Sequence, residues 1–333
     1  MQVRFSRLAV PVLALGISVG AAGCGKYSIS NIRSAKAFQD ANAMYQRSDW
    51  AGAAGRYEDA IHFNPDLGFA YFFLGHSYEQ QYRPTKKDDQ ANVDHLRKAA
   101  ENYRLAVDKM KDAKDPKEQQ VRRYAYEYLI AVYGSDKLND FAKAEPVARE
   151  LIALDPTDPS SYRIMAKLYE DQGRNDDAER ELLKAIDVRP SDPLGYQTLA
   201  GFYQKLGDFD KTINAWIKRA EVEPKNPEAW HTIGAYYQTK VFTDKRLAKN
   251  IALDLTLKGI EAENKALALS PDYYEAVTYK NILLRQEALY EKDPARVKAL
   301  LAEADVLLKR GMELREKQAG EVAKSGGKKD GGK

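Results

Sequence analysis

The chain has 333 residues, of which 44% are hydrophobic and 30% charged, and its formal net charge is +3. So high a charged fraction excludes a protein with many membrane spans, and the hydrophobic fraction excludes a mostly disordered chain. The small net charge argues against a dedicated nucleic-acid binder, which would present a concentrated basic face. At roughly 150 residues per ordinary domain, the length predicts two globular domains or one extended repeat array.

The N-terminus has the three parts of a secretory signal. Arg4 and Arg7 form a basic head, an apolar run covers residues 8–19, and small residues follow up to Cys24, the single cysteine of the chain. The apolar run is too short for a comfortable membrane span. We therefore expect residues 1–23 to be a signal peptide that is removed on export.

The last residues of this signal, Ala21-Ala22-Gly23-Cys24, resemble the lipobox of bacterial lipoproteins, although leucine is usual where Ala21 stands. The resemblance implies cleavage before Cys24, acylation of its thiol and a short linker over residues 24–33. Gly25 follows, so the aspartate that retains some lipoproteins at the inner membrane is absent. We expect a lipid-anchored protein of the cell envelope, on the periplasmic face of the outer membrane. The alternative is ordinary signal cleavage that leaves Cys24 as an idle thiol.

A spacing of 34 residues recurs in several columns through the middle of the chain. The columns are Pro156, Pro190 and Pro224; Pro159, Pro193 and Pro227; Tyr162, Tyr196 and Trp230; Met165, Leu199 and Ile233; Ala166, Ala200 and Gly234; Tyr169, Tyr203 and Tyr237; and Gly173 and Gly207. This pattern resembles the tetratricopeptide repeat, a helix–turn–helix of about 34 residues. The resemblance implies an all-α fold, a right-handed superhelical solenoid of about seven repeats over residues 34–318.

The columns also have a direct physical interpretation. Tyr162, Met165, Ala166 and Tyr169 share one face of a helix, and the small residue among them lets a partner helix approach closely. The glycines of the pattern end the first helix, because a left-handed conformation costs glycine little. The second proline of each repeat opens the next helix at its first turn. Each helix pair leaves an apolar face uncovered, so neighbouring repeats must stack.

The repeat is interrupted in two places and followed by a tail. Extra residues fall near 81–97 and 241–258, and we interpret both as second helices that are extended at their N-terminal ends. Residues 319–333 are rich in glycine and lysine, so we expect a disordered tail. The last helix before it should pack through one apolar stripe, made of Val297, Leu300, Leu301, Ala304, Leu307 and Leu308.

No group of residues in the sequence has the spacing of a catalytic or metal site. The four histidines lie far apart, and none belongs to a known ligand spacing. A phosphate-binding loop, a nucleophile elbow and a dinucleotide glycine fingerprint are also missing from the sequence. We therefore expect a protein that is not an enzyme, has no catalytic residue and takes neither a metal nor another cofactor.

The resemblance also implies where a partner binds, because this family forms its concave groove from a second face of each first helix. The residues that it places there are Phe38, Asn42, Tyr45, Phe69, Phe72, His76, Arg163, Lys167, Gln197, Gln204, His231 and Gln238. The family's clamp for a peptide C-terminus is not reproduced, since Asn42 matches one position but Phe38 replaces a lysine. Arg163 and Lys167 either hold an anion together or form a solvated basic pair.

Two phenylalanines leave a further alternative open. Phe69 and Phe72 add an apolar face to a helix that already has one, so either they contact a partner or the inserted segment near residues 84–93 covers them. The leading hypothesis is a lipid-anchored scaffold that binds protein or peptide segments, with no nucleic-acid partner. The runner-up is a self-associating structural protein whose groove is filled by its own insertions or by another copy. An enzyme or carbohydrate-binding lipoprotein is a third reading, without a motif behind it.

Overall fold

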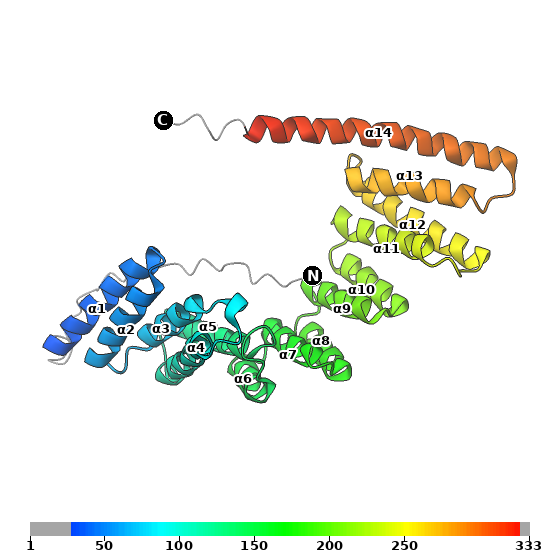
Figure 1. The fold of residues 1–333 in the computed structure, drawn as a ribbon. Helices are drawn as coiled ribbons and strands as arrows, with labels where there is room; N and C mark the ends of the chain where they lie inside the picture. Colours follow the sequence, from blue (N-terminus) through cyan, green and yellow to red (C-terminus); the bar gives the residue numbers. More distant parts are fainter. Residues whose placement is uncertain (1–27, 327–333) are drawn as a thin grey trace. The chain divides into compact units, whose positions relative to one another are not determined.

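The computed structural model describes the backbone of residues 28–326 and the side chains through residue 319. Within these residues the chain forms fourteen α-helices, one short 3-10 helix and no strand (Figure 1). The predicted all-α fold of about seven helix–turn–helix repeats is confirmed. The signal peptide, residues 1–23, and Cys24 lie outside the described residues, so the export and lipidation that we expect there remain predictions.

The chain divides into two compact units, residues 1–181 and 182–333. The first unit contains α1 (Ile29–Gln46), α2 (Trp50–Phe63), α3 (Gly68–Gln81), the 3-10 helix η1 (Pro84–Lys86), α4 (Gln90–Lys109), α5 (Pro116–Tyr133), α6 (Phe141–Leu154) and α7 (Pro159–Asp171), and α8 (Asn175–Val188) runs across the boundary. The second unit contains α9 (Pro193–Leu206), α10 (Phe209–Val222), α11 (Pro227–Thr243), α12 (Lys249–Leu269), α13 (Tyr274–Ala288) and α14 (Pro294–Gly326).

First helices begin at the positions that the proline column predicts. Pro159, Pro193 and Pro227 are the first residues of α7, α9 and α11. The residue before each proline caps the helix: in all three, a side-chain oxygen accepts a backbone N–H bond of 3.0 Å from the residue two positions ahead. These caps are Asp158, Asp192 and Asn226, which form a further column at the same spacing.

The aromatic column at the start of each first helix connects successive repeats. The hydroxyl of Tyr162 donates to the carbonyl of Pro156 over 3.0 Å, and the indole N–H of Trp230 donates to the carbonyl of Pro224 over 3.2 Å. Tyr71 makes the same bond to the residue six positions before it. A polar aromatic residue therefore packs its ring on the helix and satisfies a carbonyl at the end of the preceding repeat.

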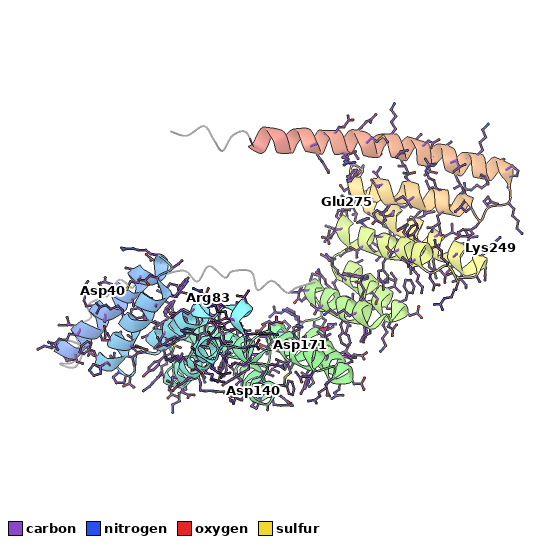
Figure 2. The ribbon with its side chains drawn as sticks, viewed as in Figure 1. Asp40, Arg83, Asp140, Asp171, Lys249 and Glu275 are labelled. Atoms are coloured by element: carbon purple, nitrogen blue, oxygen red, sulfur yellow. The ribbon has the colours of Figure 1, made fainter. Side chains whose placement is uncertain are left out.

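The turns within two repeats depend on glycine, as predicted. Gly173 and Gly207 follow α7 and α9 with φ of 69° and 75°, a left-handed conformation in which side chains other than glycine's are strained. The N–H of Gly207 bonds back to the carbonyl of Gln204 over 3.1 Å and so closes α9. The second helices then begin at their own caps, such as Asp140 of α6, which is labelled in Figure 2.

Both insertions lengthen the second helix of their repeat. α4 has 20 residues and α12 has 21, whereas α2, α6, α8 and α10 have 14 each. The first insertion also forms η1, which Asn92 holds to the start of α4. The amide nitrogen of Asn92 donates to the carbonyls of Arg83 and Lys86, each over 2.9 Å, and its oxygen accepts the N–H of Arg83 over 2.8 Å.

The structure corrects both boundaries of the predicted solenoid. α1 begins at Ile29, because the hydroxyl of Ser28 caps it by accepting the N–H of Asn31, so the linker predicted for residues 24–33 is wrong over residues 29–33. α14 continues to Gly326. The tail predicted as disordered from residue 319 is therefore wrong as far as residue 326, since the dense run of glycines starts only there.

Candidate functional site

Nine rings in the first unit form one continuous aromatic cluster. Its members are Phe38 and Tyr45 of α1, Trp50 and Tyr57 of α2, Phe72, Phe73 and His76 of α3, Tyr103 of α4 and Tyr128 of α5. Neighbouring ring centroids lie between 5.1 and 6.4 Å apart, mostly tilted or edge to face. Such geometry adds to the energy of area burial and fixes the rings in place.

Hydrogen bonds hold the polar edges of this cluster. The hydroxyl of Tyr45 lies 2.7 Å from Nδ1 of His76, and the hydroxyl of Tyr57 donates to the amide oxygen of Asn42 over 2.7 Å. Burial lowers the pKa of His76 and raises the pKa of Tyr45. Both groups are therefore neutral near pH 7, and their bond orients two rings without introducing a charge.

One carboxylate lies beside the cluster and is neutralised by a lysine. Glu79, whose side chain is 10% exposed, accepts a 2.6 Å bond from the hydroxyl of Tyr103 and pairs with Nζ of Lys137, also over 2.6 Å. These contacts connect α3 and α4 with the turn between α5 and α6. Burial raises the pKa of Tyr103 well above its usual range, so the tyrosine stays a donor to Glu79.

The first unit presents only some of its predicted groove residues. Phe72 is fully buried under Tyr103 and Tyr128, with ring centroids 5.8 and 5.7 Å away, so it belongs to the core and is withdrawn as a groove residue. These two rings belong to α4 and α5 and lie outside residues 84–93, the segment that one of the two alternatives placed over Phe72.

Of the other groove residues predicted on α1 and α3, one is hydrogen-bonded to a core ring and four are partly exposed. Asn42 is bonded to Tyr57 and so positions a core ring. Phe38, Tyr45, Phe69 and His76 are each partly exposed at the edge of the buried rings. The structure thus joins α1 and α3 through Phe38, Tyr45 and His76, which we call the aromatic edge.

The basic pair on α7 is engaged within its own unit. Lys167 forms an ion pair with Asp171, which lies one turn further along the same helix and is labelled in Figure 2. Arg163 is partly buried and also has a polar or charged partner. Neither alternative, an anion held by both side chains or a solvated basic pair, describes Lys167, which pairs with Asp171.

In the second unit, the predicted residues of α9 lie on an open face. Gln197 is partly exposed and Gln204 is exposed. A Cβ built on Gly201, between them on the same face, would meet no heavy atom within 4 Å, and Leu194 is 46% exposed. Gln238, on α11, is partly buried. The face of α9 therefore offers amide groups beside an apolar side chain.

His231 belongs to a buried pair rather than to this open face. Its Nδ1 lies 3.0 and 3.1 Å from the two carboxyl oxygens of Glu263, a fully buried residue of α12. Gly234 makes room for that carboxylate, because a Cβ there would lie 2.4 Å from Oε1 of Glu263. The rings of Tyr273 and Tyr279 enclose His231 edge to face, 5.5 and 5.0 Å away.

The carboxyl group of Glu263 in this pair has a strongly shifted pKa. Burial raises the pKa of Glu263 from 4.5 to about 7, although the hydrogen bond and charge of His231 act in the opposite direction. The sequence carried no sign of this pair, since the two residues lie on different helices 32 positions apart. The nearest signal in the sequence is Gly234, a small residue that faces the long side chain of Glu263.

No group of three or more potential metal ligands occurs among the described residues. None of the helices there combines the length and the apolar character needed to cross a membrane.

The comparisons with known proteins concern the repeat. Residues 137–202 match the family model described as tetratricopeptide repeat, whereas no curated protein matches the chain. The solved C-terminal part of a TPR repeat-containing protein from Cytophaga hutchinsonii is 16% identical with a TM-score of 0.50, covering 83% of this chain and 98% of that one.

Two further solved structures are similar over shorter lengths. MamA is 19% identical with a TM-score of 0.39, over 59% of this chain and 93% of its own. YrrB, described as a TPR protein with an unusual peptide-binding site, is 15% identical with a TM-score of 0.37, over 66% of this chain and 95% of its own. At these identities the likeness concerns the fold alone. The comparisons thus show tetratricopeptide repeat over residues 137–202, and the described helices of both units follow one another in the same helix–turn–helix arrangement.

Proposed function

We propose that the protein is a lipid-anchored scaffold of the bacterial cell envelope that binds a protein or peptide segment on the first-helix faces of its repeats. The aromatic edge is the observation that carries this proposal. Phe38, Tyr45 and His76 are partly exposed, yet the rings behind them are locked by packing and hydrogen bonds. A partner that docks there pays little ordering entropy, and aromatic contacts dominate recognition energies.

The face of α9 supports binding of an extended segment as well. Gln197 and Gln204 each bring an amide that both donates and accepts, as peptide backbone requires. The open space above Gly201 lets backbone approach the helix closely. We place the main binding energy at the aromatic edge and assign to α9 the polar contacts of a separate, weaker surface.

The envelope location rests on the signal and on Cys24 at its end. Since α1 begins at Ile29, four residues, 25–28, lie between the acylated position and the first helix, and five residue-to-residue steps join the two. At about 3.5 Å per residue they span at most roughly 18 Å. The aromatic edge would therefore lie close to the bilayer surface, where a partner from the same membrane meets it.

Replacing Cys24 with alanine should move the protein from the membrane fraction to the soluble fraction of cells. The variant lacks the thiol, and therefore the acyl chains that we propose as the membrane anchor. Ser28→Ala is the matched control, because it alters the cap of α1 but keeps the thiol. Unchanged fractionation of Cys24→Ala, together with an unmodified N-terminus at residue 24 in the wild type, rules out the anchor. Binding is tested separately, by photo-crosslinking from the aromatic edge in intact cells.

A further inference from the structure

The last helix carries a second apolar face that nothing in the described residues covers. Leu300, Ala304 and Leu307 are buried, as predicted, in a core cluster with Val277 and Leu284 of α13. Leu301 and Leu308 were expected in the same stripe, but they are 37% and 40% exposed. They lie beside the stripe and not in it, because α13 is a single helix and covers only one side of α14.

The uncovered face is regular along the helix. Leu301, Asp305, Leu308 and Met312 follow one another at spacings of four, three and four residues, the pattern of a helix-packing seam. Met312 is 58% exposed. We call these four residues the outer stripe of α14.

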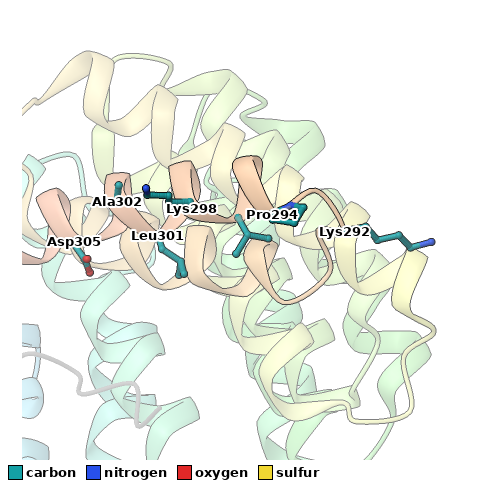
Figure 3. A pocket seen from close by; sticks show the side chains of 7 residues that line it. Lys292, Pro294, Lys298, Leu301, Ala302 and Asp305 are labelled. Carbon is teal, nitrogen blue, oxygen red and sulfur yellow. The ribbon is translucent and has the colours of Figure 1, made fainter.

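One end of the outer stripe is hollow. A pocket of about 620 Å³ opens at the start of α14, and its walls include Pro294, Lys298, Leu301, Ala302 and Asp305 (Figure 3). In Figure 3 these side chains lie along one side of the helix, with Asp305 at the far end from Pro294 and Lys298 between them. The pocket is a shallow, open depression with a mostly apolar surface, and Lys298 and Asp305 are among the residues that line it.

The other end of α14 has no helix beside it in its own repeat. α13 has 15 residues and α14 has 33, which corresponds to lengths of about 22 and 50 Å. A Cβ built on Gly311 would lie 3.5 Å from the side chain of Thr278 and 3.8 Å from that of Val277, both in the first turns of α13. Leu314 still packs against the core cluster shared with α13, so only the residues after it project beyond α13, and a helix that projects in this way is marginal without tertiary contacts.

We propose that α14 pairs in antiparallel orientation with α14 of a second copy of this chain, centred near residue 307. In that register Met312 of one copy lies level with Ala302 and enters the pocket of the other. Methionine suits such a site, since its flexible thioether adapts to irregular gaps. The projecting end of each copy then covers the pocket end of its partner, so one contact satisfies both features.

Charges at the margins fit the same register. Around residue 307, Lys298 of one copy lies level with Glu316 of the other, and Asp305 lies level with Lys309. Both pairs join opposite charges, and each occurs twice in a symmetric dimer. Asp305 already accepts a 2.5 Å bond from Arg285 on α13, so its carboxylate is held in place for the contact.

The same charges argue against a lipid surface as the occupant. A helix that lies on a membrane carries a strongly basic polar face. The charged residues in and beside the outer stripe instead alternate in sign along α14: Lys298, Asp305, Lys309 and Glu316. Alternation of this kind is typical of helix–helix pairing, where it sets orientation and register.

Sedimentation of the mature chain with Cys24→Ser over a range of concentrations tests the pairing. We expect a monomer–dimer equilibrium. Lys298→Glu and Glu316→Lys should each weaken it on the order of tenfold, since attraction becomes repulsion at two symmetric places. The double variant should return to within about threefold of the parent, because the pair is restored with its signs exchanged.

Two controls make the outcome specific to the outer stripe. Val306→Glu changes a residue that is 68% exposed on another side of α14, so it should leave the equilibrium unchanged, whereas Leu308→Glu should abolish the dimer. Ala302→Cys with Met312→Cys should give a disulfide-linked dimer on mild oxidation. A monomer at every concentration, a dimer unaffected by Leu308→Glu, or efficient crosslinking of Ala302→Cys alone would each overturn the proposal.

Discussion

Phe72→Ala should lower the free energy of unfolding of the first unit by about 3–5 kcal/mol. The ring is fully buried and contacts the rings of Phe73, Tyr103 and Tyr128, so its removal leaves a cavity between three helices. Urea denaturation followed by circular dichroism measures the loss. The aromatic edge next to it would also lose its support, so partner binding should weaken with stability.

Phe69→Ala is the matched control on the same helix. This ring is only partly buried, so less apolar area returns to water and the expected loss is about 1 kcal/mol. Equal losses for the two variants would mean that Phe72 is not the deeper residue, contrary to the packing described for α3, α4 and α5.

Glu263→Gln should remove a pH dependence from the stability of the second unit. Burial raises the pKa of Glu263 to about 7 in the folded protein, against an ordinary value of 4.5. The folded state thus binds the proton more tightly than the unfolded state. The resulting stabilisation is fully present below pH 4.5 and is lost as the pH rises through 7, a change of about 3 kcal/mol.

The glutamine is uncharged at every pH and resembles the protonated acid in shape. The variant should therefore match the wild type near pH 4.5 and exceed it by about 3 kcal/mol at pH 8 to 9. Glu261→Gln, at an exposed position of the same helix, should leave the pH profile as it is. Parallel stability profiles for wild type and Glu263→Gln would show that the buried carboxyl does not titrate in this range.

The fold could be predicted because its signals are local and repeated. Pro159 and Gly173 act on the backbone within one turn, and the same spacing brings them back at Pro193 and Gly207. The small residue of each first helix belongs to the same pattern, and Gly234 leaves room for a side chain of the partner helix α12. Propensity and spacing were sufficient wherever one helix pair determines the geometry.

The candidate site was harder to predict, because exposure depends on residues from other repeats. Phe72 occupies a groove position by spacing, yet Tyr103 and Tyr128 cover it from α4 and α5. Asn42 also occupies one, but Tyr57 binds its oxygen. No spacing within a single repeat contains that information.

The ends of the array were misjudged for a related reason. The repeat pattern describes a helix that is packed on both sides. α14 is the last helix, and in its own repeat it has a single neighbour, α13. Leu301 and Leu308 therefore read as core residues in sequence but remain exposed in the structure. This exposed apolar surface is one of the observations behind the proposed pairing with a second copy of the chain.

Photo-crosslinking in intact cells tests the central claim, that the first-helix face of the first unit binds another protein. A photoreactive residue replaces Phe38 of α1 or Gln80 of α3, whose amide nitrogen lies 3.3 Å from Nε2 of His76, and a third variant carries it at Glu101 on the exposed side of α4. We predict a crosslinked species at Phe38 and Gln80 that contains a different protein, and none at Glu101. Equal capture at all three positions, capture of only a second copy of this chain, or no capture at Phe38 and Gln80 would contradict the claim.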